Sequence, residues 1–160
     1  MIDYTSLETA IVIALAPLRS ANVDVMAWPE LEIEFAKPFA DSRLTVVYHS
    51  SEYGGPISAS QVNSDETVSM QIMIEARTLR KPFGIYQLKA AVLEKLVGLQ
   101  VPNWTKLIPA KFDMSERSEK GGVWCYNLVM KTKAVSQQEV NDDLPIYASL
   151  TSISATYGVQ

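Results

Sequence analysis

The stretch Glu66-Thr67-Val68-Ser69-Met70-Gln71-Ile72-Met73-Ile74-Glu75-Ala76, with the segment that follows it as far as Leu99, decides the fold. Apolar side chains alternate with polar ones along residues 67–76, which predicts a strand with one buried and one solvated face. After a break at residues 77–84, the apolar spacing becomes that of one helical face. The residues of that face are Ile85, Leu88, Val92, Leu96 and Leu99. We therefore expect a strand that leads directly into a packed helix, with almost no catalytic residue type in the unit.

A first helix is expected near the N-terminus. Thr5 and Glu8 have the spacing of a capping box, which predicts a helix from there to about Arg19. The expected buried stripe consists of Leu7, Ala10, Ile11, Ala14 and Leu18. Val12 and Ile13 fall outside this stripe. They are either covered by a loop or belong to a second contact surface.

Further strands are expected at residues 23–27, 44–49, 107–114 and 123–133, with Pro109 marking the third of these as an edge strand. Residues 50–65 are expected to form a long polar loop, and residues 115–122 a charged hairpin tip. The order of elements predicts an α+β fold, in which a mixed or antiparallel sheet of about four to five strands carries two long helices on one face.

The chain is expected to contain one domain. Residues 1–135 would form the α+β domain, and residues 136–160 a polar linker followed by an extended C-terminal arm. From Leu144 onward the arm carries no charged side chain and is rich in Ser, Thr, Tyr and Ile, which favour extended structure. Such an arm could pair with an exposed sheet edge of its own chain or of a neighbour.

Composition excludes several classes of function. The net charge of −4 argues against nucleic-acid binding, because neutralising phosphates needs many clustered Lys and Arg side chains. No apolar run approaches the roughly 20 residues of a membrane span. The N-terminus lacks the basic region of a signal peptide, and the single cysteine, Cys125, excludes an internal disulfide. We therefore expect assembly in the cytoplasm.

Residues able to support catalysis are scarce. His49 is the only histidine, so a histidine-based metal site is excluded, and Cys125 has no second thiol. A small enzyme that acts through His49 and Cys125 remains a minor alternative. This alternative predicts that the Cys125 thiol is exposed and has a lowered pKa. Asp142, Asp143 and Glu139 lack the spacing of a calcium loop. No catalytic, cofactor-binding or metal-binding residue is assigned.

Three segments in a fixed order carry a family resemblance. They are Val47-Tyr48-His49-Ser50-Ser51-Glu52-Tyr53-Gly54, the strand–helix unit from Val68 to Leu99 with Gly84-Ile85-Tyr86-Gln87-Leu88, and Gly122-Val123-Trp124-Cys125-Tyr126-Asn127-Leu128. Together they resemble the tail-completion proteins of Mu-like phages and prophages, which are related in fold to phage tail terminators. The resemblance spans about residues 44–133 and leaves the C-terminal arm without a counterpart.

This resemblance implies a structural role in the virion. Tail terminators form a six-fold ring at the head-proximal end of the tail tube, stop its polymerisation and offer a docking surface to the head connector. In contractile tails they also contact the sheath. The implied partners are thus further copies of this chain, the tail tube protein and the connector or neck protein. The protein would be assembled in the host cytoplasm and end in the virion, without a cofactor, enzymatic activity, nucleic-acid recognition or a membrane.

Ring assembly requires that one surface of each subunit meet a different surface of the next. The candidates for this subunit interface are Val12, Ile13, Leu107, Ile146, Leu150 and Ile153. The candidates for the loops that face tube or connector are Tyr53, Gly54, Gly55, Arg117 and Lys120. In a ring, the polar face of residues 67–75 could line the lumen or meet a neighbour.

Two further alternatives stay open besides the enzyme. A head-completion or neck adaptor protein would share the small α+β design and the ring symmetry. A tail-like injection machine, in place of an infectious phage, would use a terminator of the same molecular role.

Overall fold

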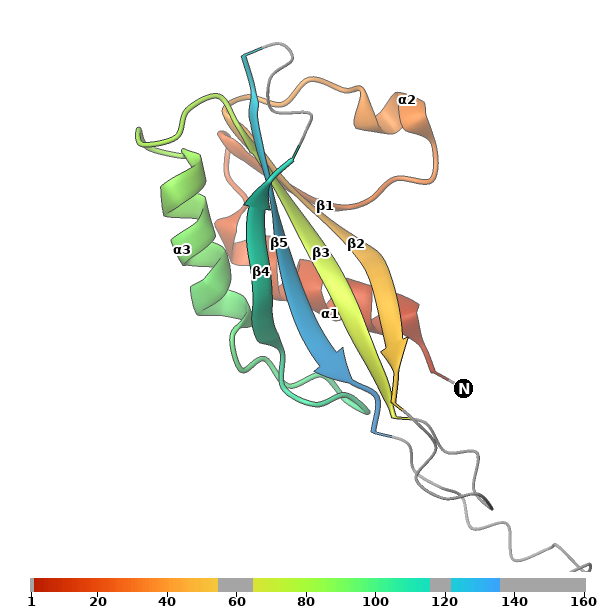
Figure 1. The fold of residues 1–160 in the computed structure, drawn as a ribbon. Helices are drawn as coiled ribbons and strands as arrows, with labels where there is room; N and C mark the ends of the chain where they lie inside the picture. The colour runs from red at the N-terminus through yellow and green to blue at the C-terminus, as the bar shows by residue number, and fades with distance from the viewer. Residues whose placement is uncertain (1, 55–64, 116–121, 136–160) are drawn as a thin grey trace, which may run out of the picture.

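A computed structural model describes residues 2–54, 65–115 and 122–135 of the chain. A short 3-10 helix, η1, extends the first α-helix, and the remaining elements follow in the order drawn in Figure 1. The elements are α1 (Tyr4–Leu15), η1 (Ala16–Leu18), β1 (Val23–Ala27), α2 (Glu32–Phe35), β2 (Ser42–Tyr53), β3 (Glu66–Ala76), α3 (Ile85–Leu96), β4 (Ile108–Met114) and β5 (Trp124–Lys133).

The five strands form one mixed sheet in the order β1-β2-β3-β5-β4. β1 runs parallel to β2, whereas the other three neighbouring pairs are antiparallel. Parallel neighbours need a crossover of a dozen or more residues. Residues 28–41, which contain α2, supply it between β1 and β2. The structure confirms the α+β class and the mixed five-stranded sheet, and it adds α2, which the sequence analysis did not predict.

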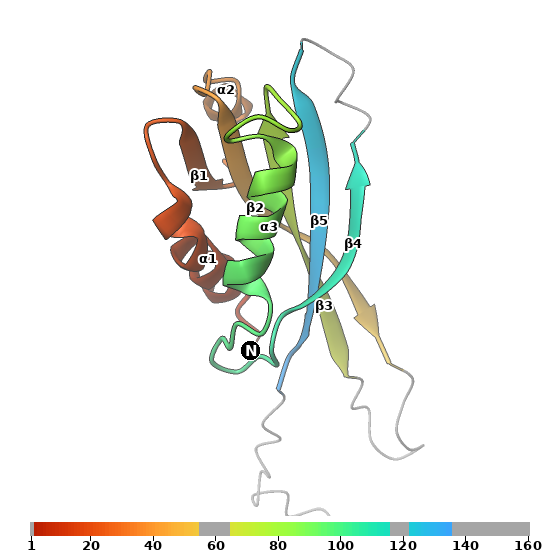
Figure 2. The ribbon, with the colours of Figure 1, turned by 90° about the vertical axis from the view of Figure 1, so that its left-hand side faces the viewer.

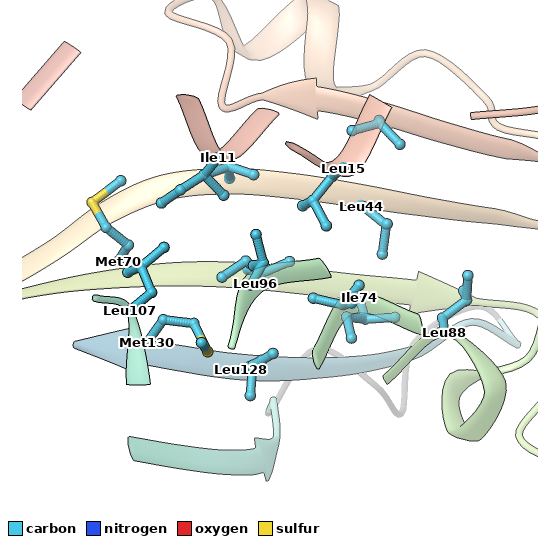
Figure 3. Close-up of a cluster of buried hydrophobic side chains, with 14 of the residues drawn as sticks. Ile11, Leu15, Leu44, Met70, Ile74, Leu88, Leu96, Leu107, Leu128 and Met130 are labelled. Carbon is cyan, nitrogen blue, oxygen red and sulfur yellow. The ribbon is translucent and has the colours of Figure 1, made fainter. Parts of the chain in front are cut away.

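The two long helices, α1 and α3, lie on the same face of the sheet (Figure 2). Leu7, Ile11 and Leu15 of α1 are fully buried against it. Figure 3 shows how aliphatic side chains from both helices and the strands meet in one cluster. The cluster includes Ile11, Leu15, Leu44, Met70, Ile74, Leu88, Leu96, Leu107, Leu128 and Met130. Burying a side chain of this size stabilises the fold by about 1.5–3 kcal/mol, so this layer holds the sheet rigid.

The unit formed by β3 and α3 matches its prediction closely. Every second residue of β3 from Val68 to Ala76 is fully buried, and α3 begins at Ile85. Gly84 is the N-cap of α3. A Cβ at this position would lie 2.7 Å from the carbonyl oxygen of Lys81 and 2.8 Å from that of Leu79. The chain therefore enters α3 through a passage that only glycine fits without movement.

The first helix begins and ends earlier than predicted. Asp3, not Thr5, is the N-cap, because its carboxylate accepts a hydrogen bond of 3.0 Å from the backbone N–H of Ser6. The capping-box prediction was wrong on this point. The α-helix ends at Leu15, just before η1, in which Pro17 lies.

Strand β2 is longer than predicted. It continues through Ser50 to Tyr53, with a register irregularity between Tyr48 and Ser50, because antiparallel pairing with β3 extends as far as the pair Tyr53 and Glu66. The predicted loop at residues 50–65 was therefore too long at its start, and residues 55–64 lie outside the described part of the chain. Most of the hairpin tip predicted at residues 115–122 also lies outside the described residues, whereas the strands on either side of it are described.

The second face of β3 is less exposed to solvent than predicted. Ser69 is buried, and Thr67, Gln71 and Glu75 are half-buried. Cross-strand neighbours explain this: Gln71 donates a hydrogen bond to Asn127 of β5, and Glu75 forms an ion pair of 2.7 Å with Arg43 of β2. A central strand is flanked on both sides, so its polar side chains pair with neighbours rather than with water.

Candidate assembly surfaces

The structure separates His49 and Cys125. Cys125 lies level with Arg43 of β2 across the sheet, since both are paired with Glu75. His49 is six residues further along β2, which corresponds to about 20 Å at the rise of a strand. Cys125 is also buried, at 2% exposure, whereas a nucleophilic thiol has to reach its substrate. The two residues do not form one catalytic site.

Two further searches concern metals and membranes. Within residues 2–54, 65–115 and 122–135, no three His, Cys, Asp or Glu side chains are grouped so that they could hold a metal ion. Among the described helices, none is both long and apolar enough to cross a membrane.

The predicted interface residues differ in their exposure. Ile13 is 65% exposed on α1 and is thus available for contact. Val12 is half-buried and packs against the core. Leu107 is fully buried, so its prediction as a contact residue was wrong: it precedes β4 and points into the core. The next residue, Ile108, is 58% exposed instead. The predicted contacts Ile146, Leu150 and Ile153 lie outside the described residues.

Of the predicted loop residues, the structure describes Tyr53 and Gly54, which lie at one end of the sheet. Tyr53, 66% exposed, is paired with Glu66 at one end, and Trp124 is paired with Ala76 at the other. The ten residue steps from Glu66 to Ala76 correspond to about 33 Å. Gly54 follows Tyr53, whereas Gly55, Arg117 and Lys120 lie outside the described residues. The two ends can therefore contact different partners simultaneously.

Tyr53 belongs to a hydroxyl cluster that the sequence analysis missed. The carboxylate of Glu66, only 5% exposed, accepts hydrogen bonds from the hydroxyls of Tyr4 at 2.7 Å, Ser51 at 2.5 Å and Tyr53 at 3.2 Å. The cluster ties the start of α1 to the end of the β2–β3 pair. Glu66 lies two residues before Val68 in β3, so its side chain is on the same, buried face of the sheet. The alternation along the strand was the signal that could have identified it.

These hydrogen bonds shift two pKa values. Burial alone would raise the pKa of Glu66, but the hydrogen bonds from Ser51, Tyr4 and Tyr53 outweigh it and lower that pKa below its ordinary 4.5. The hydrogen bond to Glu66, followed by burial, raises the pKa of Tyr4 to about 12. Both shifts favour a neutral tyrosine beside a charged carboxylate at neutral pH.

The crossover segment, residues 28–41, forms a second unpredicted surface. Leu31 is 60% exposed and Ile33 is 76% exposed. The segment is held at its return to the sheet, where the ring of Phe39 lies beneath the guanidinium groups of Arg43, at 4.8 Å, and Arg77, at 5.5 Å. The alternation of glutamates with Leu31 and Ile33 was the available signal for their exposure.

The two edges of the sheet differ in how far they are covered. At β1, the carbonyl oxygens of Val23 and Val25 accept hydrogen bonds from the backbone N–H of Ser20 and from Arg19 Nη2. At β4, the last strand of the sheet, alternate backbone groups point away from β5. Its first four residues are all exposed. The edge of β4 is thus a site at which another strand could be added.

The described part of the chain is thus an α+β domain with several exposed apolar side chains. The sequence matches the family model described as "Gp37 protein" over residues 12–153, so the chain belongs to the Gp37 family. This is a family of phage proteins.

The chain was also compared with individual curated proteins and with solved structures. No curated protein matches the sequence. A solved structure entitled "Virion of native gene transfer agent (GTA) particle" contains a chain similar to this one, with a TM-score of 0.46 and 17% sequence identity. The match covers 82% of this chain and 90% of that chain.

Proposed function

We propose that this protein is a structural component of a phage-type virion, and that within this class it is a tail terminator. It would form a ring at the head-proximal end of the tail tube, stop tube polymerisation and provide the docking surface for the head connector. Membership of the Gp37 family supports a role in a phage particle, and the resemblance described above supports the terminator role within it.

One observation supports the proposal: the two ends of the sheet, about 33 Å apart, each carry an exposed aromatic side chain. A terminator needs this design, because one end of its ring meets the tube while the other receives the connector. The exposed Tyr53 supports contact at one end, and Trp124, which is 37% exposed, supports contact at the other. The exposed side chains of Ile13, Ile33 and Ile108 are available for contacts between neighbouring subunits.

The partners follow from this arrangement. Six copies would close the ring through heterologous contacts. The tail tube protein would bind at one end and the connector or neck protein at the other, with the sheath as an additional neighbour in a contractile tail. The protein would assemble in the host cytoplasm and remain in the virion.

Tail length tests this function. Deleting the gene from its phage or prophage should give tails of uncontrolled length in electron micrographs, and a plasmid copy should restore a uniform length. Tails of normal length that lack heads would instead indicate a neck adaptor and overturn the terminator proposal.

Mass photometry of the purified protein tests the ring directly. We expect a species of six subunits, either alone or when purified tail tube is added. A protein that stays monomeric at every concentration, also in the presence of tail tube, would contradict ring formation.

A further inference from the structure

The crossover segment contains an acidic stretch, residues 30–34, whose charges are not used within the described fold. Glu30, Glu32 and Glu34 alternate with Leu31 and Ile33, and all five residues are exposed. None of the three glutamates forms an ion pair with a described residue. The acidic stretch therefore presents three carboxylates and two aliphatic side chains to solvent.

The chain that leads into α3 carries the opposite charge. Residues 77–93 contain four basic side chains and no acidic one. The first of them, Arg77, is held within the fold, because its guanidinium group donates to two carbonyl oxygens of the crossover segment. The other three form no ion pair with a described residue. They are Arg80, Lys81 and Lys89.

Two of these three cations lie against aromatic rings. The guanidinium carbon of Arg80 is 5.8 Å from the ring centre of Tyr86, and Lys89 Nζ is 4.3 Å from that of Phe112. Tyr86 is 49% exposed and lies three residues before Lys89, so the two side chains are neighbours on α3. Arg80, Lys81, Tyr86 and Lys89 thus form one basic surface with an exposed ring, the α3 entry surface.

We propose that the acidic stretch of one copy of this chain binds the α3 entry surface of the next copy. The glutamates would lie beside Arg80, Lys81 and Lys89, and Ile33 would pack against the ring of Tyr86. The opposite charges would steer the encounter and fix its orientation, and burial of the aliphatic side chains would add affinity. The contact rests on the proposed function in that it joins neighbouring subunits of the ring.

The positions of the two surfaces fit a ring. Both segments join the sheet at one level, since Ser42, where the crossover segment returns, is paired with Ala76, the last residue of β3. Figure 1 shows α2 and the start of α3 on opposite sides of the molecule, and Figure 2 shows both towards the same end. A contact between two different surfaces is heterologous, and it generates a ring where the rotation between subunits closes. Like charges disfavour the two-fold alternative, in which each surface would meet its own copy.

Cross-linking tests the contact. In a variant carrying both Ile33→Cys and Ala90→Cys, one turn after Tyr86, a short bismaleimide should join subunits into a ladder up to the size of the ring on denaturing gels. Each single variant should give far less. The matched control pair, Thr5→Cys with Ala90→Cys, moves the first cysteine to another exposed position, at the start of α1 and the other end of the sheet. The buried Cys125 is present in every variant.

Charge reversal provides a second measurement that is independent of cysteine chemistry. The variant Glu32→Lys with Glu34→Lys and the variant Arg80→Glu with Lys81→Glu should each raise the concentration needed for half-assembly roughly tenfold. Combining all four substitutions should regain most of the loss, because the charges are again opposite. Glu94→Lys, on the exposed side of α3 outside the α3 entry surface, is the control and should leave that concentration unchanged.

The outcomes separate this inference from the proposed function. Rings that give no ladder from the 33/90 pair, or a ladder no stronger than that of the control pair, overturn this contact and leave the ring intact. Rings that are insensitive to both charge reversals, or whose loss the combined variant does not restore, overturn it as well. A wild-type protein that remains monomeric with tail tube overturns both.

Discussion

At the scale of single residues, Glu66 is the most constrained polar group described. Its carboxylate is almost fully buried and accepts three hydroxyl hydrogen bonds, from Tyr4, Ser51 and Tyr53. Removing the charge of a buried acceptor weakens all its hydrogen bonds together, because charged acceptors form the stronger bonds. The cluster therefore links the first turn of α1 to the sheet end near Tyr53.

Replacing Glu66 by Gln should lower the free energy of unfolding by about 1–3 kcal/mol at neutral pH. All three hydroxyls donate to Oε1 of Glu66, so glutamine keeps a neutral acceptor there but loses the charge assistance. Urea unfolding followed by circular dichroism measures the change. Glu94→Gln, on the exposed side of α3, is the matched control and should change stability by less than about 0.5 kcal/mol. Equal midpoints for the two variants would contradict the importance of the cluster.

The same substitution predicts a pH dependence. The pKa of Glu66 is lower in the folded protein than its ordinary 4.5, so its contribution to stability is present above that value. The contribution is lost as the pH falls through the lowered pKa, because the carboxyl group then becomes protonated in the folded state. The stability difference between wild type and Glu66→Gln should therefore be constant near neutral pH and narrow in acid.

At the scale of elements, the start of α3 depends on one glycine. The backbone of Gly84 has φ −80°, which any residue can adopt, so the constraint is steric and comes from the carbonyl groups of Leu79 and Lys81. Gly84→Ala should lower the free energy of unfolding by about 1–3 kcal/mol, as overpacking does. The same change at Gly54, where a Cβ meets nothing nearer than 3.6 Å, should have little effect. Thermal unfolding of both variants tests this difference.

Sequence patterns predicted the elements whose periodicity is long and regular. β3 and α3 each repeat their pattern over ten or more residues, so their types and buried faces were predictable. Two features were not. Residues 30–34 alternate between charged and apolar side chains, as a strand would. They pair with no strand in the described part of the chain, and the structure has the short helix α2 where the pattern predicts a strand. β2 was predicted too short, because Ser50 to Tyr53 look like a polar loop until pairing with β3 is known.

The candidate surfaces were predictable only in part, for a related reason. Ile13 could be identified because it lies off the apolar stripe of its helix, and it is exposed. Leu107 was assigned wrongly, because its burial depends on how the chain before β4 folds back: its N–H bonds to the carbonyl oxygen of Leu99 and its own carbonyl accepts from Gly98. Such long-range contacts leave no periodic signal in the sequence.

At the scale of the whole molecule, the sheet acts as a spacer. At one end of the sheet, β2 ends at Tyr53 beside the start of β3; at the other end, β5 begins at Trp124 beside Ala76 (Figure 1). Helices α1 and α3 cover one face of the sheet between these ends. A protein of this shape can couple two partners that never touch each other.

Substitutions at the two ends should therefore cause different defects in virion assembly. We expect Tyr53→Ala at one end and Trp124→Ala at the other to weaken separate interfaces, each by about 2 kcal/mol where the residue is central to its contact. In a phage or prophage carrying these alleles, one set should give tails of irregular length and the other normal tails without heads, scored by electron microscopy. Mass photometry should show that both variants still form the ring, and Glu94→Lys serves as a surface control. If both sets produced the same defect, the two ends would not serve separate partners, and the sheet would have to contribute a single docking face.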